Sequence, residues 1–153
     1  MLGLTHMEND AAGRFLGIRV GPKWGSVLNE ELASYVYGTS GMMKIYQEDI
    51  PSKLSSLLPG YVGPLCVDAL IHRKPDGSLA LKPVVELNVR TTMGRIAWEW
   101  MKRQPKAGAG RLRILRRAAI SDEELHRMAE EGQGIFLNDY QSATTFLAWW
   151  ESC

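Results

Sequence analysis

Two segments of alternating character joined by a strong turn signal constrain this fold more than any other feature of the chain. The first segment covers residues 63–72, the second covers residues 79–90, and residues 74–78 between them have the sequence Lys-Pro-Asp-Gly-Ser. Proline, aspartate and glycine in this order favour a tight reversal of the chain. The two segments are therefore predicted to pair as an antiparallel β-hairpin.

A hairpin centred on Gly77 determines which side chains share a face. Counting outward from Gly77 places Asp68 directly opposite Glu86, and alternation along the second strand puts Glu86, Asn88 and Arg90 on the same face. The two carboxylates would lie roughly 5 Å apart. At an effective dielectric constant of about 20 they would repel by about 3 kcal/mol. We therefore expect a proton, a cation or a metal ion beside them.

Two interpretations of this face remain open at this point. Magnesium suits two carboxylates plus an amide oxygen, because it prefers hard oxygen ligands and completes its shell with water and phosphate oxygens. Arg90 has the geometry to bind a phosphate through two nitrogens. In the alternative, Arg90 or Lys82 simply pairs with Glu86 on a solvent-exposed sheet face. The spacing supports both interpretations equally.

The same residues carry a family resemblance. Val-Asp at 67–68 and Pro-Val-Val-Glu-Leu-Asn-Val-Arg-Thr-Thr-Met-Gly at 83–94 resemble the carboxy-terminal catalytic segment of the ATP-grasp superfamily of carboxylate-amine and carboxylate-thiol ligases. In that superfamily an acidic residue on one strand and the E-x-N motif on the next hold magnesium ions against the ATP phosphates. The resemblance implies that Asp68, Glu86 and Asn88 are ligands for Mg²⁺ or Mn²⁺. Arg90 matches the catalytic arginine of members similar to biotin carboxylase.

The resemblance implies a function and covers only one lobe of the family fold. It implies that a small carboxylate substrate is activated by ATP through an acyl phosphate. The nucleotide-binding parts of the family lie upstream, and the residues before Asp68 contain no P-loop or G-x-G-x-x-G pattern, so the ATP-binding residues stay unassigned. We expect a ligase lobe that is incomplete alone, acts with a companion lobe or as a homo-oligomer, and leaves an apolar surface around Phe15, Ile18 and Trp24. The competing expectation is a non-catalytic metal-binding, nucleotide-binding or protein-interaction fragment.

Length, composition and charge narrow the class of protein. A chain of 153 residues that is 45% hydrophobic is long enough for a single domain over residues 1–153, with residues 1–13 expected to be disordered. The net charge of +1 argues against a dedicated nucleic-acid-binding protein. No segment is long and apolar enough to span a bilayer, and the first residues lack the pattern of a secretory signal. We therefore expect a cytoplasmic protein without a membrane partner.

The remaining pattern predicts an α+β fold with a central antiparallel sheet and helices packed on one face. A strand is expected over residues 14–20. Helices are expected over residues 29–37, 47–58, 91–103 and 121–131, with Asn29 and Ser121 as caps of the first and last. Thr91 or Thr92, at the start of the third helix, is either an ordinary cap or places free amide groups beside a phosphate.

Basic and aromatic residues in the second half of the chain leave further alternatives. Residues 102–117 contain seven basic and no acidic residues, yet no aromatic residue is interleaved to stack on bases, so nucleic acid is not expected as a partner. Residues 111–114 are predicted to form an edge strand whose charges discourage unwanted pairing. Four tryptophans, Trp98, Trp100, Trp149 and Trp150, are predicted to lie in helices and mostly in the core, unless Trp149 or Trp150 marks a partner surface.

Overall fold

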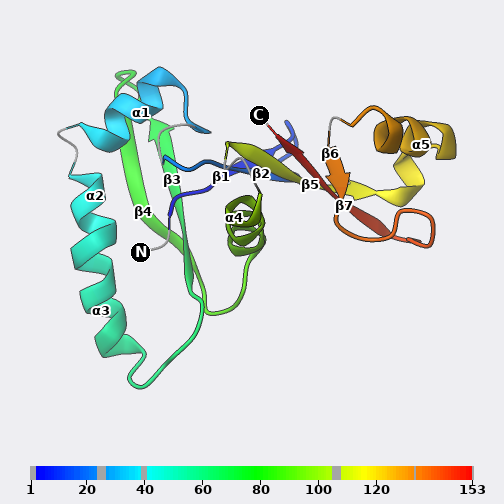
Figure 1. Ribbon diagram of the computed structural model, residues 1–153. Coiled ribbons are helices and arrows are strands. Elements are labelled where there is room, and N and C mark those ends of the chain that lie inside the picture. The colour runs from blue at the N-terminus through cyan, green and yellow to red at the C-terminus, as the bar shows by residue number, and fades with distance from the viewer. Residues whose placement is uncertain (1–2, 24–26, 39–40, 105–107, 133, 153) are drawn as a thin grey trace. The chain divides into compact units, whose positions relative to one another are not determined.

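The computed structural model describes residues 3–23, 27–38, 41–104, 108–132 and 134–152 (Figure 1). It is an α+β fold in which every described strand pairing is antiparallel, so the predicted fold class is confirmed. The chain gathers into two compact units, where the sequence predicts one domain. Residues 28–92 form one, which we call the hairpin unit, and residues 3–27 and 93–153 form the other, the sheet unit.

The hairpin unit begins with helices and ends with two strands. Its elements are α1 (Glu30–Tyr37), α2 (Met42–Lys44), a π-helical turn η2 (Ile45–Asp49), α3 (Ile50–Leu57), β3 (Cys66–Arg73) and β4 (Leu79–Asn88). Asn29 caps α1 as predicted, because its side chain accepts a hydrogen bond from the Leu32 amide. The helix predicted over residues 47–58 begins earlier, at Met42, and contains a π turn that helical periodicity does not reveal.

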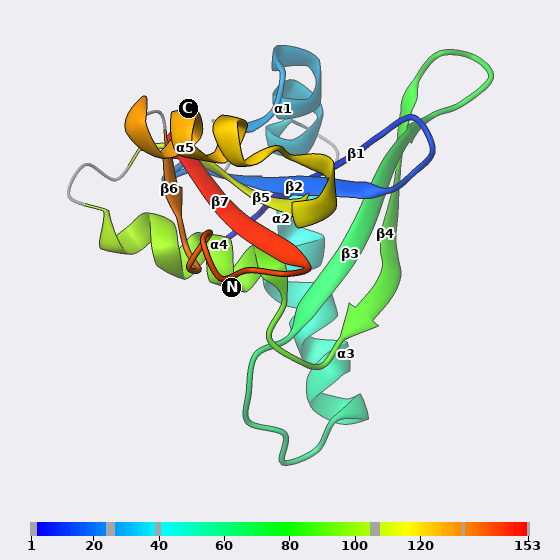
Figure 2. The same ribbon diagram turned by 90° about the vertical axis from the view of Figure 1, so that its right-hand side faces the viewer.

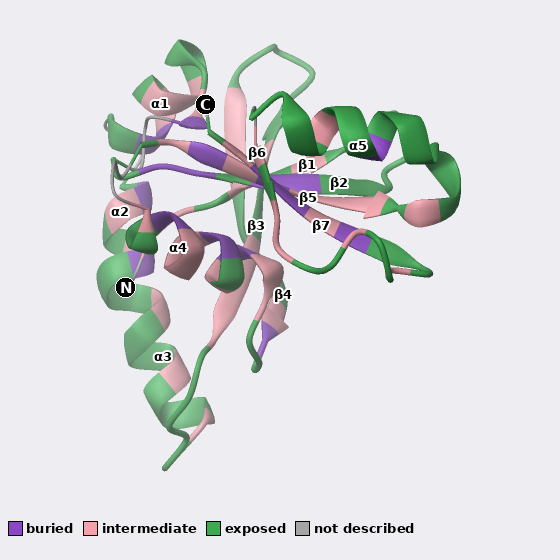
Figure 3. Cartoon of the chain, turned by 45° about the vertical axis from the view of Figure 1, so that its right-hand side comes forward, coloured by how far each residue is buried: buried purple, intermediate pink, exposed green. Residues whose placement is uncertain are grey.

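Helices α1 to α3 lie along one face of the hairpin (Figures 1 and 2). Arg73 and Ile71 are two residues apart on β3, so their side chains share one face of the hairpin. Arg73 forms an ion pair with Glu31 of α1, so the helices cover this face. The hydroxyl of Tyr46 donates to the carbonyl oxygen of Pro83 at 2.7 Å and ties η2 to β4. Helix α3 contributes no buried residue to this layer, and Figure 3 shows it largely exposed. The opposite face of the hairpin carries the candidate site.

The sheet unit is built on a five-stranded sheet with the strand order β1-β2-β5-β7-β6. These strands are β1 (His6–Asn9), β2 (Phe15–Val20), β5 (Gly110–Arg116), β7 (Phe146–Ser152) and β6 (Gly134–Phe136), with helices α4 (Met93–Arg103) and α5 (Asp122–Glu130). Strand β1 lies in the segment expected to be disordered, and its pairing with β2 accounts for its order. Within the described part of the chain, no helix is long and apolar enough to cross a membrane.

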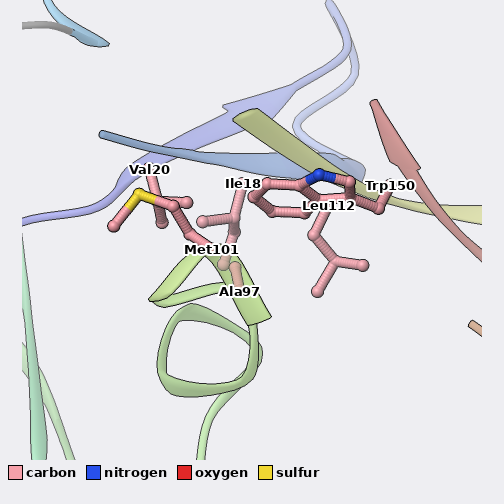
Figure 4. Packing of buried hydrophobic residues seen from close by; sticks show 6 residues of the cluster. All are labelled: Ile18, Val20, Ala97, Met101, Leu112 and Trp150. Atoms are coloured by element: carbon pink, nitrogen blue, oxygen red, sulfur yellow. The ribbon is translucent and has the colours of Figure 1, made fainter. Parts of the chain in front are cut away.

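Helix α4 packs on one face of this sheet and closes the main core (Figure 4). The buried cluster joins the strands β2, β5 and β7 to α4, and its members are Ile18, Val20, Ala97, Met101, Leu112 and Trp150. Ile18 is only 6% exposed, so it does not belong to an apolar surface for a companion lobe, whereas Phe15 is 37% exposed. Trp24, the third residue of that expected surface, lies outside the described residues.

Two predictions for the tryptophans and for residues 111–114 were wrong. Trp149 and Trp150 lie in strand β7 and not in a helix, and they are 3% and 2% exposed, so neither offers a partner surface. Because successive side chains of a strand point to opposite faces, each tryptophan enters a different layer. Strand β5 is the middle strand of the five and not an edge. Its Arg111 forms ion pairs with Glu8 and Glu151 on other strands, so the positive charge is compatible with a central position.

Two glycines make room for the tryptophans of β7. A Cβ atom on Gly110 would lie 2.0 Å from Cζ2 of Trp150. A Cβ atom on Gly134 would lie 2.4 Å from Cζ2 of Trp149. Both distances are far below van der Waals contact, so each indole ring occupies the space that any other residue at the glycine would need.

The packing predicts a large difference between two leucine truncations. Leu112 is 1% exposed in the main core and Leu57 is 71% exposed on α3. We expect Leu112→Ala to lower the free energy of unfolding by about 2–5 kcal/mol, through lost burial and the cavity left behind. The control Leu57→Ala is expected to change it by no more than about 0.5 kcal/mol. Urea unfolding followed by circular dichroism measures both, and equal losses would contradict the assignment of the core.

Candidate functional site

The hairpin brings together the acidic residues predicted from the sequence. Asp68 is the cross-strand partner of Glu86, and Cys66 is the partner of Asn88, so these four side chains share one face. The predicted pairing of Asp68 with Glu86 is therefore confirmed. It places both carboxylates on the hairpin face opposite the one that pairs with α1.

The predicted pairing is right for a reason that the sequence does not reveal. Next to the turn, Arg73 pairs with Leu79, so the hairpin is centred one residue before Gly77. A bulge then separates the pair Leu70 and Lys82 from the pair Asp68 and Glu86, with one residue between them on β3 and three on β4. The earlier centre and the two extra residues of β4 compensate each other. Because β4 has two more residues than β3 between these pairs, which is an even number, Lys82 and Glu86 remain on the same face.

Asp68 is held by two hydrogen-bond donors on this face. Nδ2 of Asn88 donates to Oδ2 of Asp68 at 3.1 Å, and Sγ of Cys66 donates to Oδ1 at 3.7 Å. Asn88 is 6% exposed, so its amide is held within the structure. The like charges led us to expect a cation, yet neutral donors already stabilise the Asp68 carboxylate. The polar cluster is therefore compatible with folding before any metal binds.

Cys66 is a further member of the site, on the same face of the hairpin as Asp68. Burial raises the pKa of the Cys66 thiol, and the nearby charge of Asp68 raises it further. A hydrogen bond with Thr92 and the positive charge of Arg90 act in the opposite direction on this pKa. Thr92, predicted as a helix cap, thus takes part in the site, and so does the charge of Arg90. The available signal was the position of Cys66 two residues before Asp68 on the same strand.

Glu86 lies at the exposed side of the cluster, whereas Arg90, predicted on the same strand face, lies two residues beyond the end of β4 at Asn88, so strand alternation does not extend to it. Both residues are exposed, as is Lys82. Among the ion pairs between described residues, none joins Glu86 to Lys82 or to Arg90. The surface ion pair that the spacing allowed is therefore not formed in this structure.

The donor set fits one class of metal ion. Asp68, Glu86 and Asn88 offer two carboxylates and one amide oxygen, which are the ligands that Mg²⁺ and Mn²⁺ prefer. Among the described residues, no three His, Cys, Asp or Glu side chains come together as a metal site. A metal ion here would thus have few protein ligands and would take the rest of its shell from water and phosphate oxygens.

Comparison of this chain with protein-family models, with curated proteins and with solved structures finds no match. The resemblance to the ATP-grasp superfamily therefore rests on the sequence alone, chiefly on residues 67–68 and 83–94. The function of the site has to be argued from its contacts.

The raised pKa of Cys66 predicts slow reaction with a thiol reagent. In a Cys153→Ser background, Cys66 is expected to react slowly with a disulfide reagent at pH 8, because only the thiolate attacks. Asp68→Asn removes a negative charge that raises this pKa, so the reaction is expected to become faster, by roughly tenfold for each unit by which the pKa falls. The rate measured from pH 7 to 10 tests this expectation. Glu48→Gln, an exposed change elsewhere in the hairpin unit, is the control, and equal rates in all three proteins would contradict it.

Proposed function

We propose that the face formed by Asp68, Glu86 and Asn88 binds Mg²⁺ or Mn²⁺ as part of the magnesium-ATP site of an ATP-grasp-like, ADP-forming ligase. One observation carries the proposal. Asp68 lies directly opposite Glu86, and the amide of Asn88 is bonded to Asp68 on the same face. This juxtaposition supplies the hard oxygen donors of a magnesium site, in the order along the chain that the resemblance requires.

The residues of this face would have distinct roles in the proposed reaction. A bound metal ion supplies charge neutralisation for the ATP phosphates. At present the Nδ2 group of Asn88 faces Asp68. Rotation of the amide would bring its carbonyl oxygen, the atom that a metal ion binds, to that position. Arg90 is exposed two residues beyond Asn88, where its guanidinium would hold an oxygen of the migrating phosphoryl group. Positioning and charge stabilisation account for most of the rate enhancement in such a transfer.

The proposed chemistry has two balanced steps. A carboxylate oxygen of the substrate attacks the γ-phosphorus of ATP, the bond from that phosphorus to the β-phosphate oxygen breaks, and an acyl phosphate and ADP result. A nucleophile, such as an amine or a thiol, then attacks the acyl carbon and releases inorganic phosphate. In this reaction the small carboxylate is the substrate and ATP is the co-substrate.

A second candidate function is a non-catalytic fragment that binds metal, nucleotide or a protein partner. It is favoured by the two donors on Asp68, which stabilise the cluster without a metal. Calorimetry on mixing the chain with Mg²⁺ and ATP, followed by measurement of ADP release with a panel of carboxylic acids, separates the two functions. ADP formation that depends on the acid supports the ligase, and binding without ADP under every condition supports the fragment.

The proposed site predicts that metal ions stabilise the chain against heat. A ligand that binds only the folded state at ten times its Kd adds about 1.4 kcal/mol of stability. We expect this to raise the Tm by about 3–6 °C for a chain of this length in millimolar Mg²⁺ or Mn²⁺. Glu86→Gln should abolish the rise, because it removes one of the two anionic ligands.

The matched control for this experiment is Glu48→Gln, which removes an exposed carboxylate elsewhere in the hairpin unit. It should retain the full rise in Tm. A Tm that does not change with metal in the unmodified chain, or a rise that survives Glu86→Gln, would argue against the site. Calcium at the same concentration tests the preference for a small, octahedral ion.

A further inference from the structure

We infer that Tyr46 is a positioning residue for this site, because its hydroxyl anchors the bulge of β4 that returns Glu86 to its place opposite Asp68. The inference rests on the proposed function of that face. Tyr46, the bulge and the site all belong to the hairpin unit.

Tyr46 is a buried anchor in an unusual stretch of helix. Its side chain is 8% exposed, and its hydroxyl donates to the Pro83 carbonyl oxygen at 2.7 Å. It lies within the π-helical turn Ile45–Asp49, which interrupts the helix between α2 and α3. Single π turns are rare in proteins, and they occur frequently at functional sites. The turn thus places the one buried tyrosine of the described hairpin unit against the backbone of β4.

Pro83 is the point where β4 leaves its partner strand. It is the first of the three residues, Pro83 to Val85, that stand opposite the single residue Ala69. Proline has no backbone N–H to donate to β3, and its carbonyl accepts from Tyr46. At this point β4 is thus held to the helical layer. Val84 and Val85 are 46% and 51% exposed, so the packing of their side chains contributes little to holding the bulge.

The position of Glu86 depends on where β4 rejoins the ladder. Glu86 follows the bulge at once and is the first residue of β4 to pair again, opposite Asp68. If β4 rejoined one residue earlier or later, Glu86 would turn to the face that the helices cover. Because Tyr46 fixes the first residue of the bulge, β4 has fewer positions at which it can rejoin the ladder with β3. Tyr46 therefore acts on the site through the backbone, without touching a ligand of the metal.

Two tyrosines of this unit make a matched pair of variants. Tyr46→Phe removes only the anchoring hydroxyl. Tyr61→Phe removes a hydroxyl that also donates to a proline carbonyl, that of Pro64 at 2.8 Å, but in an exposed segment before β3. The Kd for Mn²⁺, measured from the electron paramagnetic resonance signal of the free ion, is expected to rise about tenfold in Tyr46→Phe. It should stay unchanged in Tyr61→Phe.

A second readout separates positioning from mere stabilisation. The Tm in the presence of EDTA reports stability alone, and a purely structural role would lower this Tm in Tyr46→Phe while leaving the Kd for Mn²⁺ unchanged. That result would overturn the inference. Amide hydrogen exchange at Glu86 and Leu87, also in EDTA, is expected to become faster in Tyr46→Phe if the anchor holds the strand.

Deletion of Val84 and Val85 tests the bulge without changing Tyr46. It leaves Pro83 alone opposite Ala69, so the ladder can run to Glu86 without a bulge. Glu86 then still pairs with Asp68, so we expect the deletion variant to retain Mn²⁺ affinity, and Tyr46→Phe to have no further effect in the deletion background because no bulge is left to anchor. Loss of Mn²⁺ affinity in the deletion variant, with Tyr46 intact, would overturn the inference even if Tyr46→Phe fails to fold, because it would show that the register of Glu86 does not determine binding.

The outcomes for the inference and for the proposed function are distinguishable. Failure of the unmodified chain to bind Mn²⁺ would remove the metal role, and faster exchange at Glu86 in Tyr46→Phe would then still show that the anchor positions the strand. Binding of Mn²⁺ with equal affinity to the unmodified chain and to Tyr46→Phe would retain the metal site and overturn the role of Tyr46.

Discussion

The hydrogen-bonded register between β3 and β4 is the constraint on which the candidate site depends. Side chains of a strand alternate between two faces, so two residues of one strand share a face when the number of positions from one to the other is even. Here the bulge adds an even number of residues to β4, and Asp68, Glu86 and Asn88 stay together on one face. The other face binds the helices through Arg73 and through the backbone of Pro83. The register of the hairpin thus places the contacts with the helices on one face and the residues of the candidate site on the other.

The two units manage like charges in different ways. In the sheet unit Glu8 pairs with Arg19 and Arg111, and Glu151 pairs with Arg111, so charges of opposite sign compensate each other across the strands. In the hairpin unit Asp68 accepts from a neutral amide and a neutral thiol, and it takes part in none of the ion pairs between described residues. An uncompensated carboxylate retains its attraction for a cation, whereas a paired one has lost most of it. This difference is why the hairpin face, and not the charged face of the sheet, is the candidate site.

Sequence reasoning succeeded where local signals decide the structure. Asn29 and Ser121 cap their helices because a side-chain oxygen and a nearby amide suffice for a cap. It failed where a distant partner decides. The segment with Trp149 and Trp150 shows no clear alternation because both faces of β7 are covered, and a strand buried on both faces resembles a buried helix in sequence.

The same limit applies to the site itself. The arginines of β5 suggested an edge strand, since their partners on β1 and β7 are far away in the sequence. The faces of Asp68, Glu86 and Asn88 followed from alternation and a turn, which are both local. The bulge, the π turn and the bond of Tyr46 to Pro83 join segments that no local pattern relates, so they emerge only from the structure.

The seating of each tryptophan of β7 against a glycine has a consequence for how this sequence can diverge. Any side chain at Gly110 collides with the ring of Trp150, so a larger residue at position 110 is acceptable only after a smaller residue has replaced Trp150. A Cβ atom on Gly134 would also lie 2.3 Å from the backbone carbonyl oxygen of Trp150, so a smaller residue in place of Trp149 would not by itself make room there. Descendants of this chain are therefore expected to replace Gly110 only after Trp150 and to keep Gly134, and this order of change would mark the sheet unit even after most other residues had drifted.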